Sequence, residues 1–246
     1  MEDLRQLSIV IPVFNEQENL ELLCEKVKQA LSAMDLEDWE VILVNDGSRD
    51  NSEAVMEAIA TADARFKPIH FVANQGQTAA MDAGIRHVRF AFFATMDADL
   101  QNDPADLRLL KPAMADGIGA VCGVRVQRRD TFIRRISSKI ANWVRNKLSN
   151  ETITDTGCSL KLFRTQAFER IKLYEGMHRF LPTLIKLEGY SVVEVPVGHH
   201  PRHAGESKYG VWNRVFKSFT DLLAVRWMKK RYLRYQIKTR QESTEK

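Results

Sequence analysis

Hydrophobic and polar residues alternate in blocks along the first hundred residues. Short apolar runs of strand length are separated by longer segments in which apolar residues recur at helical spacing. Four of the runs are predicted to be strands, at 8–13, 39–44, 69–72 and 90–96. Strands that alternate with helices are typical of a mostly parallel sheet with crossover helices, so the pattern predicts an α/β, Rossmann-like fold. Ligands of such sheets bind beyond the carboxyl ends of the strands.

Polar side chains follow three of these predicted strands. They are Asn15 and Glu16 after the first, Asn45 and Asp46 after the second, and Asp97 and Asp99 after the fourth. Because the carboxyl ends of parallel strands meet at one edge of a sheet, we expect these side chains to lie close together. Each cluster alone is equally compatible with a turn or a helix cap. An edge that binds a ligand without catalysis would carry the same residues.

The stretch from Asp97 to Gln101 is the most distinctive of the three. Alternate residues of an extended chain point to the same side, so Asp97, Asp99 and Gln101 are predicted to project together. Two neighbouring carboxylates repel each other unless a cation lies between them. Oxygen ligands of this type suit a hard divalent cation whose shell is completed by phosphate oxygens. The alternative is a solvated acidic turn. That alternative would be the better interpretation if the two aspartates were the only evidence for a site.

The pattern becomes less regular after residue 104. Further elements are predicted as a helix after 104, a strand at 120–126, a turn into a strand at 154–163, helices at 167–173 and 180–187, and a strand at 190–197. The segments 132–145 and 211–235 have the pattern of basic amphipathic helices, either ordinary surface helices or helices that lie on a membrane.

The predicted organisation is a catalytic domain followed by a helix and a tail. The domain spans 1–210, with a nucleotide-binding half at about 7–104 and an acceptor half at about 105–210. The basic amphipathic helix at 211–235 is a candidate for membrane association, and the charged residues 236–246 are predicted to be disordered.

Charge is unevenly distributed over the 246 residues, whose formal net charge is +4. Residues 202–246 carry 12 Lys and Arg against 4 Asp and Glu, whereas the other 201 residues carry 24 against 28. Such asymmetry indicates an anionic partner surface. The aromatic and basic signature of RNA-binding domains is absent, so nucleic acid is not the expected partner.

Several other classes are not supported by the sequence. The three cysteines, Cys24, Cys122 and Cys158, are widely spaced and fit a reducing cytoplasm rather than a disulfide framework or a zinc site. The sequence shows no signal peptide, no apolar run long enough to span a membrane, no G-x-G-x-x-G motif and no Walker A motif.

Taken together, the motifs resemble those of family-two glycosyltransferases with a GT-A fold. The matching segments are IVIPVFNE at 9–16, VNDGS at 44–48, NQG at 74–76 and MDADLQNDP at 96–104. Within this family the likeness is strongest to the polyprenyl-phosphate branch, which includes dolichyl-phosphate mannosyltransferase and undecaprenyl-phosphate aminoarabinose transferase. That likeness rests on DADLQNDP at 97–104, DTGCSLKLF at 155–163 and RHAGESKY at 202–209.

The resemblance implies a role for individual residues. The nucleotide sugar would be held by Pro12, Phe14, Glu16, Asp46, Asp97, Ala98, Asp99, Arg202 and Lys208. Mg²⁺ or Mn²⁺ would be held by Asp97, Asp99 and Gln101. The acceptor phosphate would be held by Arg125, Ser207 and either Arg134 or Arg135. The catalytic set would be Asp97, Asp99, Arg202 and Asp155, where Asp155 either orients the acceptor or caps the turn that follows it.

The resemblance also implies the reaction. An inverting enzyme would move a sugar from a UDP- or GDP-linked donor to a polyprenyl phosphate at the cytoplasmic face of the membrane. Several relatives continue into transmembrane helices and this sequence does not, so the expected membrane attachment is through the basic helices or a separate small membrane protein. The alternatives are a soluble family-two transferase for a glycan or protein acceptor, and a non-enzymatic module that binds a nucleotide sugar or nucleic acid.

Overall fold

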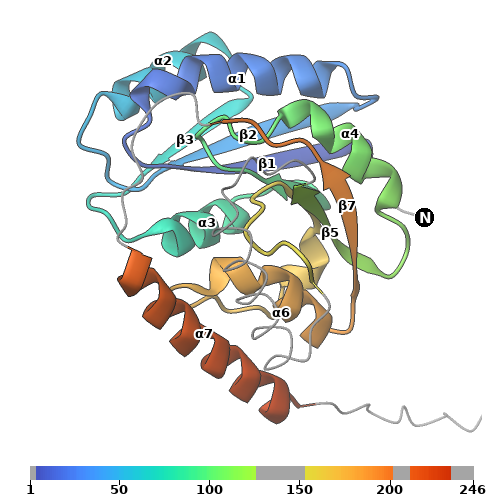
Figure 1. Ribbon diagram of the computed structural model, residues 1–246. Helices are drawn as coiled ribbons and strands as arrows, with labels where there is room; N and C mark the ends of the chain where they lie inside the picture. Colours follow the sequence, from blue (N-terminus) through green and yellow to red (C-terminus); the bar gives the residue numbers. More distant parts are fainter. Residues whose placement is uncertain (1–3, 126–152, 202–210, 234–246) are drawn as a thin grey trace, which may run out of the picture.

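One mixed sheet of seven strands forms the centre of the computed structural model, which describes residues 4–125, 153–201 and 211–233 (Figure 1). The strands are β1 (Gln6–Val13), β2 (Asp38–Asn45), β3 (Phe66–His70), β4 (Phe92–Thr95), β5 (Ile118–Arg125), β6 (Lys161–Arg164) and β7 (Ser191–Val197). Their order across the sheet is β3-β2-β1-β4-β6-β5-β7. The first four strands are parallel, and β6 runs antiparallel to both of its neighbours. The predicted α/β class and the mostly parallel sheet are therefore confirmed.

The helices cover both faces of the sheet. They are α1 (Gln17–Ser32), α2 (Ser52–Ala62), α3 (Gln77–Arg86), α4 (Leu107–Leu110), α6 (Leu181–Leu187) and α7 (Val211–Arg231). Short 3₁₀ turns are η1 (Pro104–Asp106), η2 (Lys111–Ala113), η3 (Thr165–Phe168) and η4 (Met177–Phe180). Figure 1 shows α1 and α2 on one side of the sheet and α3 and α6 on the other.

Strand β1 shows why the apolar runs are nearly continuous. Ile9 and Ile11 pack into the core cluster that contains residues of α1, α2 and α4, whereas Val10 packs into the cluster that contains residues of α3 and α6. All three side chains are fully buried. A strand covered on both faces needs apolar residues at every position, which is the pattern of a parallel sheet between two helical layers.

Three predicted elements differ from the structure. No helix forms over 167–173, where only the turn η3 is present. Phe168 packs edge-on against the stacked rings of Phe93 and Phe163, at ring-centroid distances of 5.0 and 5.2 Å. The third strand begins earlier than predicted, since Phe66 pairs with Val41 of β2. The long C-terminal helix ends at Arg231 rather than at 235.

Candidate active site

The ends of β1, β2 and β4 meet at one edge of the sheet, as predicted. The amide of Asp46 donates to the carbonyl of Val13 over 2.8 Å, which joins the end of β2 to the end of β1. The amide of Met96 donates to the carbonyl of Val10 over 3.3 Å, which joins the segment after β4 to β1. The three polar clusters are thus held to a common edge by main-chain hydrogen bonds.

The turn after β1 is held in an unusual backbone conformation. Asn15 has a φ of 53°, a left-handed conformation that a residue other than glycine adopts only when its surroundings hold it there. Its amide donates to Ser48 Oγ over 2.9 Å, and its Oδ1 accepts from the amide of Arg49 over 2.7 Å. The amide of Glu16 donates to Ser52 Oγ over 3.0 Å. The partly buried side chains of Pro12 and Phe14 lie in the same stretch of chain.

Asp46 fastens the segment that precedes α3. Its carboxylate accepts from Asn74 Nδ2 (2.8 Å), the amide of Gln75 (2.7 Å) and the amide of Gly76 (3.0 Å). Burial raises the pKa of Asp46, and these three donors oppose that rise. The structure therefore places Asp46 at the predicted edge. The Asp46 carboxylate also has a structural role, because it holds the residues that directly precede α3.

The acidic segment after β4 is not an extended strand. β4 ends at Thr95, and Leu100 has a φ of 58°, so the geometric reason for expecting alternate residues to project together was wrong. Met96, Ala98 and Leu100 nevertheless pack into one core cluster. Of the three predicted ligands, Asp99 is buried, and Asp97 and Gln101 are partly buried. Since the side chain of Ala98 is buried, only its main chain can contact a nucleotide.

The side chain of Ser159 fastens this segment to the connection between β5 and β6. Ser159 Oγ accepts from the amide of Asp97 over 3.1 Å and donates to Asn102 Oδ1 over 3.0 Å. The carboxylate of Asp99 accepts from the amide of Gln101 over 3.2 Å. The segment from Asp97 to Asn102 is therefore pinned at both ends.

The electrostatics of the segment suit a divalent cation. Burial, and after it the charge of Asp99, raises the pKa of Asp97 to about 6. The hydrogen bond from Ser159 and the charges of Lys161 and Arg125 act in the opposite direction. Two carboxylates that disfavour each other's charge, together with an amide oxygen at Gln101, are ligands that Mg²⁺ and Mn²⁺ accept. They supply at most part of a six-ligand shell, and in the described residues no three or more His, Cys, Asp and Glu form a metal-binding group.

Two residues beside the acidic pair were not identified from the sequence. Gln77, the first residue of α3, donates from Nε2 to Asp97 Oδ1 over 2.8 Å. Lys161 is buried, lies opposite Thr95 in the β4–β6 pairing, and donates to the carbonyl of Cys158. The only sequence signal for Gln77 was its position after the N-Q-G motif. The signal for Lys161 was a charged residue in an otherwise apolar run, because a buried charge is costly unless it has a partner.

Arg125 and Asp155 form a two-pronged ion pair at the end of β5. Arg125 Nε donates to Asp155 Oδ2 over 2.7 Å, and Nη2 donates to Oδ1 over 2.8 Å, with both side chains largely buried. Asp155 Oδ1 also accepts from the amide of Gly157 over 3.1 Å. The expected turn-capping role of Asp155 is thus present. The charge of Arg125 acts on Asp97, which places this pair in the electrostatic surroundings of the acidic segment.

The remaining predicted site residues lie outside the part of the chain that the structure describes. They are Arg134, Arg135, Arg202, Ser207 and Lys208. The chain that leads to Arg202 does reach the site, because the amide of His200 donates to the carbonyl of Gln101 over 2.9 Å. The amide of Gly198 also donates to Asp106 Oδ2 over 2.7 Å.

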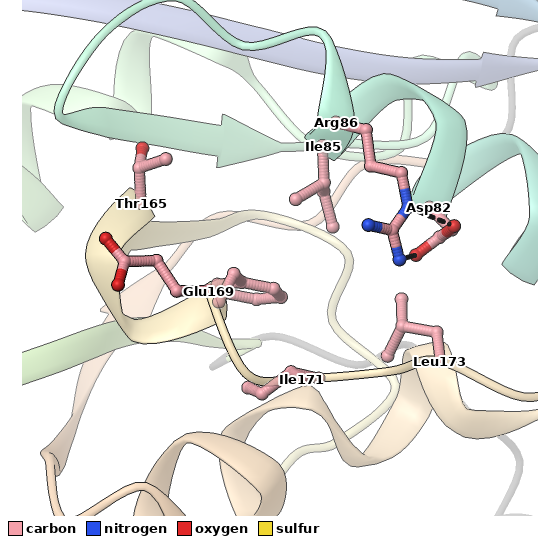
Figure 2. Close-up of a pocket in the computed structure, with 8 residues that line it drawn as sticks. Asp82, Ile85, Arg86, Thr165, Glu169, Ile171 and Leu173 are labelled. Atoms are coloured by element: carbon pink, nitrogen blue, oxygen red, sulfur yellow. Dashed lines mark hydrogen bonds and ion pairs between the residues drawn. The ribbon is translucent and has the colours of Figure 1, made fainter.

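A groove of about 310 Å³ lies at the other end of α3 (Figure 2). It is lined by Asp82, Ile85, Arg86, Thr165, Phe168, Glu169, Ile171 and Leu173. Arg86 and Asp82 pair with each other within α3 at 2.8 Å, as Figure 2 shows. None of the predicted site residues lines this groove.

The fold and the site together define a class, the glycosyltransferases with a GT-A fold that use a nucleotide sugar. The sequence matches the family described as "Glycosyl transferase family 2" over residues 8–172, and the chain belongs to that family. It is 35% identical over 238 residues to a dodecaprenyl-phosphate galacturonate synthase of Rhizobium johnstonii, a match that covers 95% of this chain and 69% of the relative. It is 34% identical to an undecaprenyl-phosphate 4-deoxy-4-formamido-L-arabinose transferase of Salmonella choleraesuis, over 89% of this chain and 67% of the relative.

Solved structures show the same fold at low sequence identity. The glucosyl-3-phosphoglycerate synthase of Mycobacterium tuberculosis in complex with phosphoglyceric acid superposes with a TM-score of 0.66 at 14% identity, over 92% of this chain and 80% of the other. The same enzyme in complex with Mn²⁺ and UDP-glucose has a TM-score of 0.66 at 15% identity, over 89% and 79%. The predicted GT-A fold and the predicted glycosyltransferase class are therefore both confirmed.

Proposed function

We propose that this glycosyltransferase moves a sugar from a UDP- or GDP-linked donor to a polyprenyl phosphate at the cytoplasmic surface of the membrane, with inversion at the anomeric carbon. The observation that carries the proposal is the position of the Arg125–Asp155 pair, because Asp155 belongs to the same segment as Ser159, whose Oγ accepts from the amide of Asp97. A cation beside a donor site is what an anionic acceptor requires. The two curated relatives described above are both named for polyprenyl-phosphate acceptors.

The donor is held by the edge where β1, β2 and β4 end. Pro12, Phe14, Glu16 and Asp46 contact the nucleoside, and Asp97 with the main chain of Ala98 continues that surface toward the diphosphate. Asp97, Asp99 and Gln101 would hold Mg²⁺ or Mn²⁺, and the bound metal would supply positive charge for the departing nucleoside diphosphate. Arg202 and Lys208, which follow His200 in the sequence, would supply positive charge for the diphosphate.

The acceptor is held from the β5 side of the site. Asp155 fixes the Arg125 guanidinium through two N–H groups, and the positive charge of that guanidinium attracts the phosphate of the acceptor. Ser207 and Arg134 or Arg135 complete the acceptor set. A phosphate oxygen is already anionic at neutral pH, so attack on the anomeric carbon needs no strong general base. Asp155 holds Arg125 in position for this contact.

This proposal is tested by a transfer assay with defined components. The purified chain is mixed with a panel of UDP- and GDP-sugars, a short-chain polyprenyl phosphate, and Mg²⁺ or Mn²⁺, and the lipid product is identified by mass spectrometry. We expect a polyprenyl-phosphate sugar with one donor of the panel, and no product after EDTA or in Asp99→Asn. Transfer only to a glycan or protein acceptor, or nucleotide-sugar binding without transfer, contradicts the proposal.

A further inference from the structure

Helix α7 presents two unlike faces in the described residues 220–233. Its inward side chains Leu222 and Val225 are buried in a cluster with Met177, Phe180, Leu184 and Leu187. Just past the helix, Tyr232 donates from its hydroxyl to Glu188 Oε2 over 2.9 Å. The domain thus occupies one face of the helix, as Figure 1 also shows where α7 runs beside α6.

The opposite face is exposed and has a definite order of residues. Leu223 is 45% exposed and Trp227, one helical turn later, is 64% exposed. Ala224 lies between them, and Lys230 and Arg231 follow one turn further on, all exposed. These five residues recur at helical spacing, so they form a single stripe that we call the outward face. Large exposed apolar side chains gathered on one stripe indicate an interaction surface for a protein or a membrane.

We propose that the outward face of α7 docks on an anionic lipid bilayer, with the helix lying parallel to the membrane. Trp and Leu beside Lys and Arg are the combination that such helices use, because tryptophan favours the headgroup region and cations attract anionic lipids. Each such cation contributes about 1 kcal/mol near the surface. Along α7 there are six Lys and Arg against one Asp, so the whole helix has the charge that this partner requires.

Charge also argues against a second copy of this chain as the occupant. A two-fold dimer through the outward face would bring together two helices that each carry six Lys and Arg against one Asp, and like charges at close range repel. The helix does not span the bilayer, because its inward face is packed on the domain. In the described part of the chain, no helix is both long and apolar enough to cross a membrane.

The inference deepens the proposed function, because it supplies the surface that would bring the enzyme to a lipid acceptor. Lipid binding itself needs neither donor nor acceptor, so it can be measured independently. The full chain is floated with vesicles of phosphatidylglycerol and phosphatidylethanolamine in equal parts, and in parallel with vesicles of phosphatidylcholine alone. We expect the wild-type chain to float with the anionic vesicles and to be released by high salt.

Two variants and two matched controls locate the surface. Leu223→Ala/Trp227→Ala removes the apolar part of the stripe, and Lys230→Glu/Arg231→Glu reverses its charge. Each is expected to weaken binding to anionic vesicles by about tenfold or more. Leu109→Ala removes a leucine of similar exposure (42%) on α4, and Lys26→Glu/Arg108→Glu makes the same change in net charge on α1 and α4. Both controls should bind as the wild-type chain does, and circular dichroism checks that all variants fold.

The outcomes separate this inference from the proposed function. Equal loss in the Lys26→Glu/Arg108→Glu control would mean that net charge alone drives binding, which overturns the assignment to α7. Unchanged vesicle binding in both α7 variants overturns it as well, and so does wild-type self-association, measured by light scattering, that these variants abolish. Failure of transfer to every polyprenyl phosphate, with intact α7-dependent vesicle binding, would reject the proposed function and leave the docking surface standing.

Discussion

Gln77 Nε2 donates a hydrogen bond of 2.8 Å to Oδ1 of Asp97, which connects the start of α3 to the acidic segment after β4. The position of Gln77 is itself set by Asp46, whose carboxylate accepts from the amides of Gln75 and Gly76. The ends of β2 and β4 are therefore coupled through one short segment. Asp97 receives a neutral donor that orients its carboxylate without cancelling its charge.

We expect Gln77→Ala to weaken the metal-dependent binding of the donor nucleotide. Loss of a hydrogen bond to a carboxylate at a partly exposed site removes about 1 kcal/mol, which corresponds to about a fivefold higher Kd for UDP or GDP in the presence of Mn²⁺. Isothermal titration calorimetry measures this directly. Gln75→Ala is the matched control, because Gln75 contacts Asp46 through its main-chain amide, which alanine retains. Equal affinities for both variants would contradict the role assigned to Gln77.

Glu40 gives a prediction for stability and its pH dependence. It is fully buried on β2 and accepts from Ser8 Oγ, Lys67 Nζ and the amide of Arg89. Burial alone would raise the pKa of Glu40, but the three donors outweigh it and hold the pKa below its usual value. Its contribution to stability is therefore fully present above the unfolded-state pKa of about 4.5 and is lost as the pH falls through the folded-state pKa.

Urea unfolding between pH 3 and pH 7 tests the role of Glu40. Glu40→Gln should lower the free energy of unfolding by about 2–3 kcal/mol at pH 7, and the difference from the wild-type chain should shrink as the pH falls below 4.5. Glu37→Gln changes the same residue type in an exposed pair with Arg5, and should change the free energy by less than about 0.5 kcal/mol. A constant difference at every pH would mean that the charge of Glu40 is not what stabilises the sheet.

Substitution of Gly176 by alanine is expected to cause a steric clash where α7 packs on the domain. Its φ is 85°, and a Cβ added there would lie 2.2 Å from Oδ2 of Asp221 in α7. Gly189 has a similar φ of 94° with nothing within 4 Å of an added Cβ, so Gly189→Ala carries the backbone strain without the clash. Because the added Cβ meets only the side chain of Asp221, which must leave its rotamer, we expect Gly176→Ala to lose about 0.5–1.5 kcal/mol more than Gly189→Ala in urea unfolding. Equal losses would show that Asp221 moves aside freely.

The positions of the first four strands along the chain and the edge of the site could be predicted because both depend on local pattern. A run such as Ile9–Ile11 is apolar at every position only when both faces of the strand are covered, and that pattern can be read within a few residues. Polar residues at strand ends are equally local. The parallel topology then brings Asn15, Asp46 and Asp97 to one edge without any knowledge of tertiary contacts.

The contacts that complete the site could not be predicted in this way. Asp46 and Gly76 are 30 residues apart, as are Arg125 and Asp155, and no periodic pattern links such positions. The turn at Leu100 depends on the packing of its side chain in the core, which overrides the extended conformation that its neighbours suggest. The helix expected over 167–173 was wrong for the same reason, because contacts of Phe168 with Phe93 and Phe163 outweigh helical propensity.

The Arg125–Asp155 pair allows the acceptor to be tested separately from the fold. Arg125→Gln alone leaves the buried carboxylate of Asp155 unpaired, so it should lower the free energy of unfolding by about 3–5 kcal/mol. The double variant Arg125→Gln/Asp155→Asn removes both charges and keeps neutral hydrogen-bonding groups, so most of that stability should return. Transfer should not return, because the phosphate of the acceptor has lost its cation. We expect the KM for a polyprenyl phosphate to rise by about tenfold or more in the double variant, with the KM for the donor unchanged.

A second pair of the same geometry provides the control for this experiment. Arg65 donates from Nε and Nη2 to the two carboxylate oxygens of Asp63 over 2.9 and 2.7 Å, and neither residue belongs to the predicted site. Arg65→Gln/Asp63→Asn should leave both KM values unchanged. Recovery of transfer together with stability in Arg125→Gln/Asp155→Asn would show that the pair is purely structural, and would favour an acceptor without a phosphate. Loss of transfer at recovered stability assigns Arg125 to the acceptor phosphate.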